Sequence, residues 1–410
     1  MIPRPDEPLT LLGGLSAEAF LREYWQRKPL LVRQAVPGFE SPLSPEELAG
    51  LACEEAVISR VVQERGAEGD WAVRHGPFEE EDFLALPETH WTLLVSDVEK
   101  HLPELRACLE PFRFVPDWRM DDLMVSYAAP AGSVGPHVDQ YDVFLLQAHG
   151  RRRWQIDTAL VDEDNFLPDL ELRIIRDFTP AQEWVLEPGD MLYLPPRIAH
   201  HGIAEGPCMT WSIGFRAPAW RDLMASWVDE RYASIPADDR YGDAGMSVQE
   251  NPGEITPEAL RRLIRGLRAA LDTRDAELAR WLGRHLTEPK AELLEHLPLP
   301  EPVSGDEARA LLDRTDRLER HGAARLAWIR GEAGPILFVN GREHHMPPGC
   351  EPLVRLLCGE MSFETRSINQ LADNLPEAEA LLVDLCGAGV LLPIPGPSDQ
   401  DAPANERKQM

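Results

Sequence analysis

The pattern of hydrophobic and polar positions changes along the chain, and its first part, residues 1–218, has a mixed texture. Apolar residues first recur at steps of three and four, which predicts helices over 16–26, 44–53, 79–86 and 98–109. Short apolar runs bounded by Gly and Pro follow, which is typical of strands. These runs are LMVSYAAP, DVFLLQAHG, RRRWQIDT, EWVLEPGD, MLYLPP and CMTWSIGFRAP. The region therefore predicts a β-barrel or sandwich with helices packed outside it.

The next region, residues 219–300, has a helical pattern. ITPEALRRLIRGLRAALDT and DAELARWLGRHLTE repeat apolar residues at helical spacing. Thr256 is the expected N-cap of the first of these helices, with Pro257 at its first position. The pattern alone leaves open whether this helical pair is a dimerisation bundle or a linker.

Residues 301–395 change texture again, and the predicted fold class is α+β. ARLAWIRGEAGPILFVNGREHHM predicts two strands around a Gly-Pro turn, and two helices are expected in EPLVRLLCGE and EAEALLVDLCGAG. Helices beside a small β-ribbon suggest a winged-helix-like domain. Residues 396–410 are polar and contain Pro, which predicts a disordered tail.

Composition narrows the cellular setting. No apolar run is long enough to span a bilayer, and no signal peptide is recognisable, so a cytoplasmic protein without membrane contact is expected. Six scattered cysteines without a C-x-x-C pair argue against a thiolate zinc site or a disulfide framework. The net charge of −29 disfavours nucleic acid and favours a basic partner, although acidity also serves solubility alone.

Candidate metal ligands occur in two separate segments. GPHVDQYD contains His137-x-Asp139, and residues two apart on a strand point to the same face. By itself this pair also fits a surface turn. LEPGDMLYLPPRIAHHG resembles the second motif of the cupin superfamily and supplies a second histidine, with Arg197 where a glycine is usual. The motif register favours His200 as the third ligand and leaves His201 pointing away. Two histidines and a carboxylate are typical of non-haem iron(II) oxygenases.

Arg152 is the candidate anion ligand. RRRWQI follows a His-Gly turn, and strand parity places Arg152 on the same face as the apolar Trp154 and Ile156. A buried arginine needs an anion, either a protein carboxylate or a bound ligand. The far carboxylate of 2-oxoglutarate is such a ligand, because the planar guanidinium binds a carboxylate through two parallel hydrogen bonds.

Taken together, these segments resemble the bacterial JmjC-type ribosomal oxygenases. The similarity is strongest over residues 114–218 and extends to YWQRKPLLVRQA near the N-terminus. The resemblance implies a double-stranded β-helix (a JmjC or cupin barrel) with flanking helices in 1–218, a helical dimerisation region in 219–300, and a winged-helix-like domain in 301–395.

The resemblance also implies site residues and an activity. His137, Asp139 and His200 are the expected iron(II) ligands, and Arg152 is expected to bind 2-oxoglutarate. Ser126 matches a polar position of the co-substrate pocket, and Thr210 and Ser212 are further candidates there. With oxygen as the other co-substrate, such an enzyme hydroxylates a side-chain carbon, here expected to be that of an arginine in a large-subunit ribosomal protein. A homodimer is also implied.

Three other functions remain open. The first is a JmjC oxygenase that acts on a histidine or a methylated lysine. The second is a metal-binding cupin without oxygenase activity, although such proteins usually have more histidine ligands, so Asp139 argues against this. The third is a DNA-binding regulator, which the acidic charge and the lack of a basic recognition helix disfavour.

Overall fold

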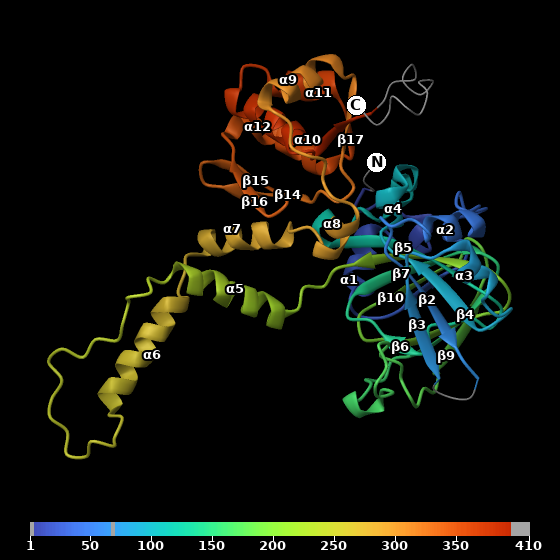
Figure 1. Cartoon of the computed structure of the whole chain (residues 1–410), viewed down its shortest axis with the longest axis horizontal. Helices are drawn as coiled ribbons and strands as arrows, with labels where there is room; N and C mark the ends of the chain where they lie inside the picture. Colours follow the sequence, from blue (N-terminus) through green and yellow to red (C-terminus); the bar gives the residue numbers. More distant parts are fainter. Residues whose placement is uncertain (1–3, 67–69, 395–410) are drawn as a thin grey trace.

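The computed structural model describes residues 4–66 and 70–394. Along these residues, a β-rich part built from the first half of the chain is followed by helices that extend away from it, and then by a second compact part (Figure 1). The disordered tail predicted for 396–410 lies outside the described residues. In the described ranges, no helix is both long and apolar enough to cross a membrane.

Two antiparallel sheets form the β-rich part, and they confirm the predicted double-stranded β-helix. The larger sheet has eight strands in the order β1-β10-β7-β12-β5-β4-β2-β3, and the smaller sheet has four in the order β6-β11-β8-β9. The bounds of the larger sheet, in that order, are Leu30–Val32, Met191–Leu194, Asp142–His149, Cys208–Phe215, Met120–Ala128, Trp91–Val95, Ser59–Glu64 and Trp71–His75. Those of the smaller sheet are His137–Val138, Ala199–Ala204, Arg152–Asp157 and Gln182–Leu186.

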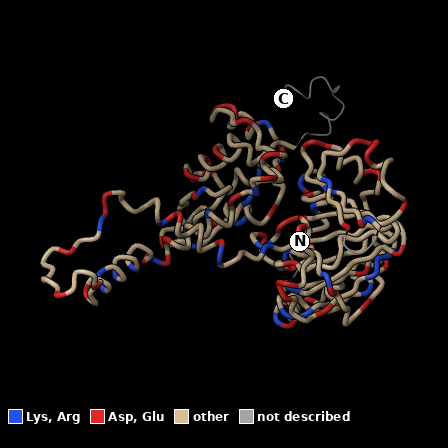
Figure 2. The backbone as a smooth tube through the Cα atoms, turned by 60° about the horizontal axis from the view of Figure 1, so that its bottom comes forward, with Lys and Arg blue, Asp and Glu red and all other residues tan. Residues whose placement is uncertain are grey.

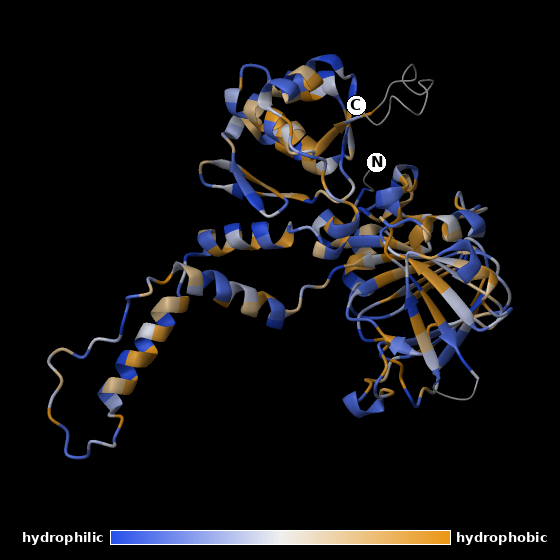
Figure 3. Ribbon diagram, in the orientation of Figure 1, coloured by the Kyte–Doolittle hydropathy of each residue, from blue (hydrophilic) through white to orange (hydrophobic). Residues whose placement is uncertain are grey.

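The core lies between the larger sheet and the helices outside it. Phe144 of β7 and Tyr193 of β10 are fully buried and pack against Phe20 of helix α1. The ring centroid of Tyr193 lies 4.9 Å from that of Phe20 and 4.9 Å from that of Phe144. α1 (Ala17–Glu23) and α2 (Pro45–Leu51) begin at serine N-caps. Figure 3 shows hydrophobic residues along the strands of this sheet. The helices thus cover one face of the sheet and leave the inside of the barrel for other residues.

Three expectations for the first half need correction. Strands β1, β2, β3 and β4, which extend the larger sheet at its two edges, were not predicted. The single helix expected over 98–109 is instead α4 (Val98–His101) followed by the 3₁₀ helix η2 (Pro103–Phe112). Proline disfavours helical geometry in the residue before it, and Leu102 accordingly has φ −118° and ψ 86°. Helix α3 (Glu80–Leu84) is shorter than expected.

The helices of the middle region are α5 (Trp220–Ser234), α6 (Pro257–Leu271), α7 (Asp275–Leu286) and α8 (Ala291–His296). The prediction for Thr256 is confirmed, because its hydroxyl accepts a hydrogen bond from the amide of Ala259. Neither α5 nor α6 has a buried residue. Both extend away from the two compact parts in Figure 1.

The C-terminal part has more elements than predicted. Its helices are α9 (Gly305–Arg314), α10 (Glu351–Gly359), α11 (Thr365–Ala372) and α12 (Pro376–Gly387), of which α9 and α11 were not predicted. Its two sheets have the orders β17-β13-β18 and β14-β15-β16. In the first sheet the strands are, in that order, Ser362–Glu364, Arg317–Arg320 and Leu391–Pro393. In the second sheet they are Leu326–Gly331, Gly334–Val339 and Arg342–His345. The two strands predicted around a Gly-Pro turn are present as β14 and β15, although the turn between them lies at residues 332–333, just before the Gly-Pro pair. The third strand of this ribbon, β16, was not predicted.

The third strand of that ribbon follows from a local turn. Val339 pairs with Arg342 across a two-residue loop. Asn340 and Gly341 in the loop have φ values of 48° and 79°. An Asn-Gly pair with positive φ at both positions is the preferred two-residue hairpin turn. The dipeptide was therefore available in the sequence as a sign of the hairpin.

Candidate metal centre and co-substrate pocket

Among the described residues, one set of three metal-ligating side chains lies close enough to hold an ion: His137, Asp139 and His200. Their ligand atoms all lie within 4.8 Å of one another. His137 begins β6 and Asp139 follows that strand, whereas His200 comes from β11. β6 and β11 are antiparallel neighbours in which His137 is paired with His200. The strand register therefore brings together two motifs that are about 60 residues apart.

The two histidine rings are oriented for metal binding through Nε2. The backbone carbonyls of Gly135 and Ile198 each lie 2.9 Å from a ring Nδ1, of His137 and His200 respectively. Such a contact fixes the proton on Nδ1 and leaves the Nε2 lone pair free for a metal. The Nε2 atoms lie 3.9 and 3.5 Å from the carboxylate oxygens of Asp139. This donor set suits iron(II), and it leaves coordination positions for other ligands.

Burial keeps the His200 ring neutral. Removal from solvent, together with the nearby His137, lowers the pKa of His200 to about 4. At neutral pH the imidazole is therefore unprotonated, which is the form that binds a metal.

His201 lies on the other face of β11. It does not line the cavity that contains His200, and its ring instead lies beside Phe178, with centroids 6.2 Å apart. The opposite orientation of the two histidines agrees with the register predicted from the motif.

Arg197 occupies the turn that precedes β11. It has a φ of 71°, the left-handed conformation that glycine adopts without strain. Its amide donates a hydrogen bond of 2.7 Å to the carbonyl of Asp139. The arginine therefore adopts the conformation expected of the usual glycine, and the turn still delivers His200 to the centre.

Arg152 is buried inside the barrel, as its strand parity predicts. The side chain lies in β8, where residues 152, 154 and 156 are buried and the residues between them are partly exposed. Its guanidinium reaches the hydroxyls of Ser126 and Thr210 at 3.5 Å and the carbonyl of Gly202 at 3.2 Å. No carboxylate among the described residues pairs with it, and its Nε has no hydrogen-bond partner. Burial lowers the pKa of Arg152, as expected for a cation without an anion.

Gly202 makes room for this arginine. A Cβ atom at Gly202 would lie 2.7 Å from Nε of Arg152 and 2.8 Å from the ring of Trp154. The neighbouring Arg151 and Arg153 point outward and pair with Glu205, and Arg153 also pairs with Glu183. Of the three consecutive arginines, only Arg152 lies inside the barrel without a carboxylate partner among the described residues.

The small polar residues suggested by the sequence surround Arg152. Ser126 on β5 is paired with Thr210 on β12. Ser126, Thr210 and Ser212 are buried and line the same cavity as the three metal-ligating residues. The Thr210 hydroxyl also donates to the buried amide oxygen of Gln147, a residue that the sequence interpretation did not single out.

The cavity has a volume of 430 Å³ and continues from Arg152 past the metal centre to an acidic mouth. Asp121, Asp122, Tyr141 and Lys290 line it there, and none of these was predicted. Burial raises the pKa of Asp122 to about 6, against the attraction of Lys290. Burial acts to raise the pKa of Asp121 as well, but the positive charges of Lys290 and Arg216 outweigh it and lower this pKa to about 2. Strand parity could have found Asp122, which shares a face of β5 with Ser126.

Two family models agree with this architecture. Residues 107–223 match a JmjC domain, and residues 267–392 match a ROXA-like winged helix. The second match supports the winged-helix-like prediction for the C-terminal part.

Similar proteins cover between half and nearly all of the chain. The ribosomal protein uL16 3-hydroxylase of Escherichia coli is 34% identical over 90% of this chain and 95% of its own length. A probable ribosomal oxygenase of Haemophilus influenzae is 42% identical over 51% of this chain and 52% of its own. Crystallised E. coli YcfD is 33% identical, with a TM-score of 0.80 over 96% of this chain and all of that one. Another YcfD structure, with cobalt and 2-oxoglutarate, is 34% identical, with a TM-score of 0.75 over 91% of this chain and 96% of that one.

Proposed function

The chain belongs to the JmjC-type ribosomal oxygenases, and from this premise we propose that it hydroxylates a side-chain carbon of an arginine in a large-subunit ribosomal protein. One observation carries the proposal. A single cavity contains the His137–Asp139–His200 set, a buried Arg152 without a carboxylate partner, and acidic residues at its mouth. These three features suit the metal, the dicarboxylate co-substrate and a cationic side chain, respectively.

The enzyme is a 2-oxoglutarate-dependent dioxygenase that uses iron(II) and oxygen. Bound iron supplies oxygen activation coupled to the decarboxylation of 2-oxoglutarate. We propose that the two histidines and Asp139 hold the metal, and that Arg152 binds the far carboxylate with Ser126 and Thr210 beside it. The buried walls keep bulk water from this end of the cavity, so the ion pair between Arg152 and the carboxylate is strengthened.

The acidic mouth supports an arginine as the target. Asp122 faces the cavity and forms no ion pair with a described residue, and its carboxylate accepts one hydrogen bond, from the amide of Asp97. A carboxylate with a free oxygen in a partly dry site suits a guanidinium, which it binds through two hydrogen bonds. Acidic residues are distributed over the whole molecule as well (Figure 2), and they favour the approach of a basic protein.

The activity is tested with the iron-loaded enzyme, 2-oxoglutarate and purified large-subunit ribosomal proteins. We expect a mass gain of about 16 Da, from one inserted oxygen, on an arginine of one such protein, together with substrate-dependent succinate. A gain on histidine, or the loss of a methyl group from lysine, would instead support the other JmjC activities. If succinate never depends on any ribosomal protein, the proposed substrate is wrong.

Asp122→Asn is expected to weaken binding of the basic substrate without affecting the co-substrate. The isosteric change removes the charge, so the KM for an arginine-containing substrate should rise about tenfold or more, since charged hydrogen bonds contribute about 1.5–3 kcal/mol. Steady-state kinetics with varied peptide and fixed 2-oxoglutarate measures this. Asp164→Asn, an exposed change on the 3₁₀ helix η4 (Glu163–Asn165), is the control. An unchanged KM in Asp122→Asn would contradict guanidinium recognition by this carboxylate.

We further infer that α5 and α6 form a homodimer interface. Apolar side chains repeat at three- or four-residue steps along both helices and are exposed: Trp220, Met224, Val228 and Tyr232 on α5, and Leu260, Leu263, Ile264, Leu267 and Leu271 on α6. Figure 3 shows the hydrophobic residues that repeat along α6. Exposed apolar surface of this extent marks an interaction site, and a second copy offers the same surface in return.

Leu267→Glu is expected to convert the dimer to a monomer, because a charge at an apolar interface loses its hydration. Sedimentation equilibrium at micromolar concentration measures the mass. Arg265→Glu, a change of charge at an exposed position on the same helix, should leave the mass unchanged. A wild-type chain that sediments as a monomer would contradict the proposed interface.

We also propose that the winged-helix-like part does not bind DNA directly, since the net charge of −29 on the whole chain opposes approach to the phosphate backbone. A ribosomal protein substrate supports a cytoplasmic location.

A further inference from the structure

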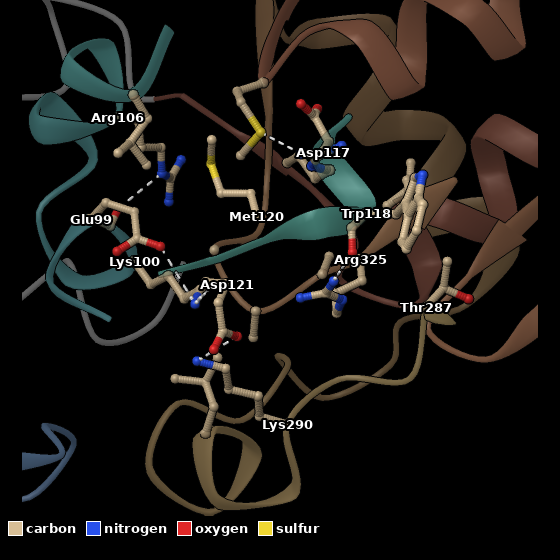
Figure 4. A pocket seen from close by; sticks show the side chains of 18 of the residues that line it. Glu99, Lys100, Arg106, Asp117, Trp118, Met120, Asp121, Thr287, Lys290 and Arg325 are labelled. Carbon is tan, nitrogen blue, oxygen red and sulfur yellow. Dashed lines mark hydrogen bonds and ion pairs between the residues drawn. The ribbon is translucent and has the colours of Figure 1, made fainter. Parts of the chain in front are cut away.

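A second cavity lies between the barrel and the C-terminal part, and the proposed function does not use it. It has a volume of 120 Å³ and is lined by η2 and β5 on one side and by β13, β14 and α7–α8 on the other. Figure 4 shows its side chains. None of the proposed metal or 2-oxoglutarate ligands lines it, although Asp121 and Lys290 line both cavities.

Two arginines in this cavity lack a carboxylate partner among the described residues. Arg320 ends β13 and is only 8% exposed, yet its Nε and one terminal nitrogen have no hydrogen-bond partner. Its other terminal nitrogen contacts the thioether of Met361, a weak acceptor. Arg325 precedes β14. Its guanidinium donates one hydrogen bond of 3.3 Å to the carbonyl of Trp118, but its buried Nε is unpartnered. The guanidinium of Arg325 lies between Trp118 and Asp121 in Figure 4.

The neighbouring carboxylates are already engaged by other cations. Arg113 binds both oxygens of Asp117, at 3.0 and 2.7 Å. Asp121 pairs with Lys290 and Arg216, at 3.1 and 2.8 Å. The two arginines therefore have no protein anion within reach that is not shared with another cation. Burial lowers the pKa of Arg320, and burial together with Arg216 lowers the pKa of Arg325 to about 10. Both shifts show that the surroundings disfavour positive charge.

We propose that this cavity binds a small tetrahedral oxyanion, the phosphate group of inorganic phosphate or of a phosphate monoester. The two positive charges match a dianion, and the three free donors, Nε and one terminal nitrogen of Arg320 and Nε of Arg325, suit its oxygens. The volume is below the roughly 300 Å³ at which sites for larger ligands begin, which excludes a nucleotide. Arg320, with two free donors, is more than nine-tenths buried, and Arg325 is partly buried, which distinguishes this site from a solvated surface patch.

An anion here would hold the two parts of the molecule together. Arg320 and Arg325 flank the loop that approaches the barrel, where a Cβ at Gly322 would lie 3.0 Å from the carbonyl of Lys100. Because Lys290 lines both cavities, the oxyanion site borders the mouth of the active-site cavity. The bound anion would therefore stabilise the C-terminal part against the barrel.

The test uses sulfate as the tetrahedral dianion, because it stays soluble with iron(II). The full-length enzyme, loaded anaerobically with iron(II) and 2-oxoglutarate, is titrated calorimetrically with sulfate at constant ionic strength. We expect one saturable site per chain with a Kd below about 1 mM, and a thermal midpoint that rises with sulfate concentration. Glycerol 3-phosphate forms a second arm: tighter binding than sulfate identifies a monoester as the ligand, and equal binding identifies the free oxyanion.

Variants separate this site from other anion binding. Arg320→Met should weaken sulfate binding at least tenfold and abolish the sulfate-dependent rise in midpoint. Arg317→Met, on the exposed side of the same strand, should change neither. If Arg320→Met does not fold, Arg325→Gln and Arg320→Lys decide, and both should weaken binding at least tenfold. No saturable binding to the wild type, or equal binding by the folded variants, would overturn the proposal.

Discussion

Replacing His200 with alanine is expected to abolish stable iron binding and reduce substrate-independent 2-oxoglutarate turnover by at least about a hundredfold. Loss of a group that only supports a metal ligand already costs about 10–100-fold, and loss of the ligand itself should cost more. Asp139 and His137 alone would leave the ion with two protein ligands. Iron content after desalting and succinate formation measure the two effects.

His201→Ala is the matched control for this prediction. The two histidines are adjacent in sequence and both have a pKa lowered to about 4 by burial. Only His200 lines the cavity, so His201→Ala should retain iron and turnover. Loss of iron in His201→Ala together with its retention in His200→Ala would show that the ligand had been assigned to the wrong residue.

Arg152→Met is expected to remove most of the affinity for 2-oxoglutarate. Truncating one partner of a buried, hydrogen-bonded charge pair costs about 2–5 kcal/mol, which corresponds to roughly 30-fold to several-thousand-fold in affinity. Methionine keeps the length and the apolar stem, so the fold should tolerate the change. The KM for 2-oxoglutarate in the uncoupled reaction, with iron in excess, measures the loss.

Arg151→Met controls for loss of an arginine from the same strand region. Arg151 is exposed and pairs with Glu205, and an exposed ion pair contributes about 0–1 kcal/mol. Its removal should therefore leave the KM for 2-oxoglutarate unchanged. If Arg152→Met also has an unchanged KM, another group binds the far carboxylate.

The sequence predicted the candidate metal and 2-oxoglutarate ligands, but it did not predict the residues at the mouth of the cavity. His137 and Asp139 are two residues apart, and the parity of β8 was enough to expect Arg152 inside, because strand geometry is local. Asp121, Asp122, Tyr141 and Lys290 were missed. Lys290 comes from the region just before α8, far along the chain, and no local pattern relates it to Asp121, with which it pairs at 3.1 Å.

The misjudged elements have local and non-local causes. Pro103 and the Asn340-Gly341 turn were visible in the sequence, and their known geometries explain the broken helix and the third strand. β2 and β4 were not predicted, and their place in the sheet depends on pairing with each other and, for β4, with β5. Such pairing gives a segment its strand conformation through hydrogen bonds to distant residues. The local sequence pattern therefore does not predict it.

By itself, the sequence determined which residues are candidates for an iron centre and for a dicarboxylate site, since residue type, motif spacing and strand parity depend only on neighbours along the chain. The tertiary structure decided what those residues meet. The antiparallel register of β6 and β11 sets His137 opposite His200. The pairing of β5 with β12 places Ser126 and Thr210 beside Arg152. The contact between the barrel and the C-terminal part leaves Arg320 and Arg325 without an anion, because burial and loss of solvent arise only when distant segments pack together.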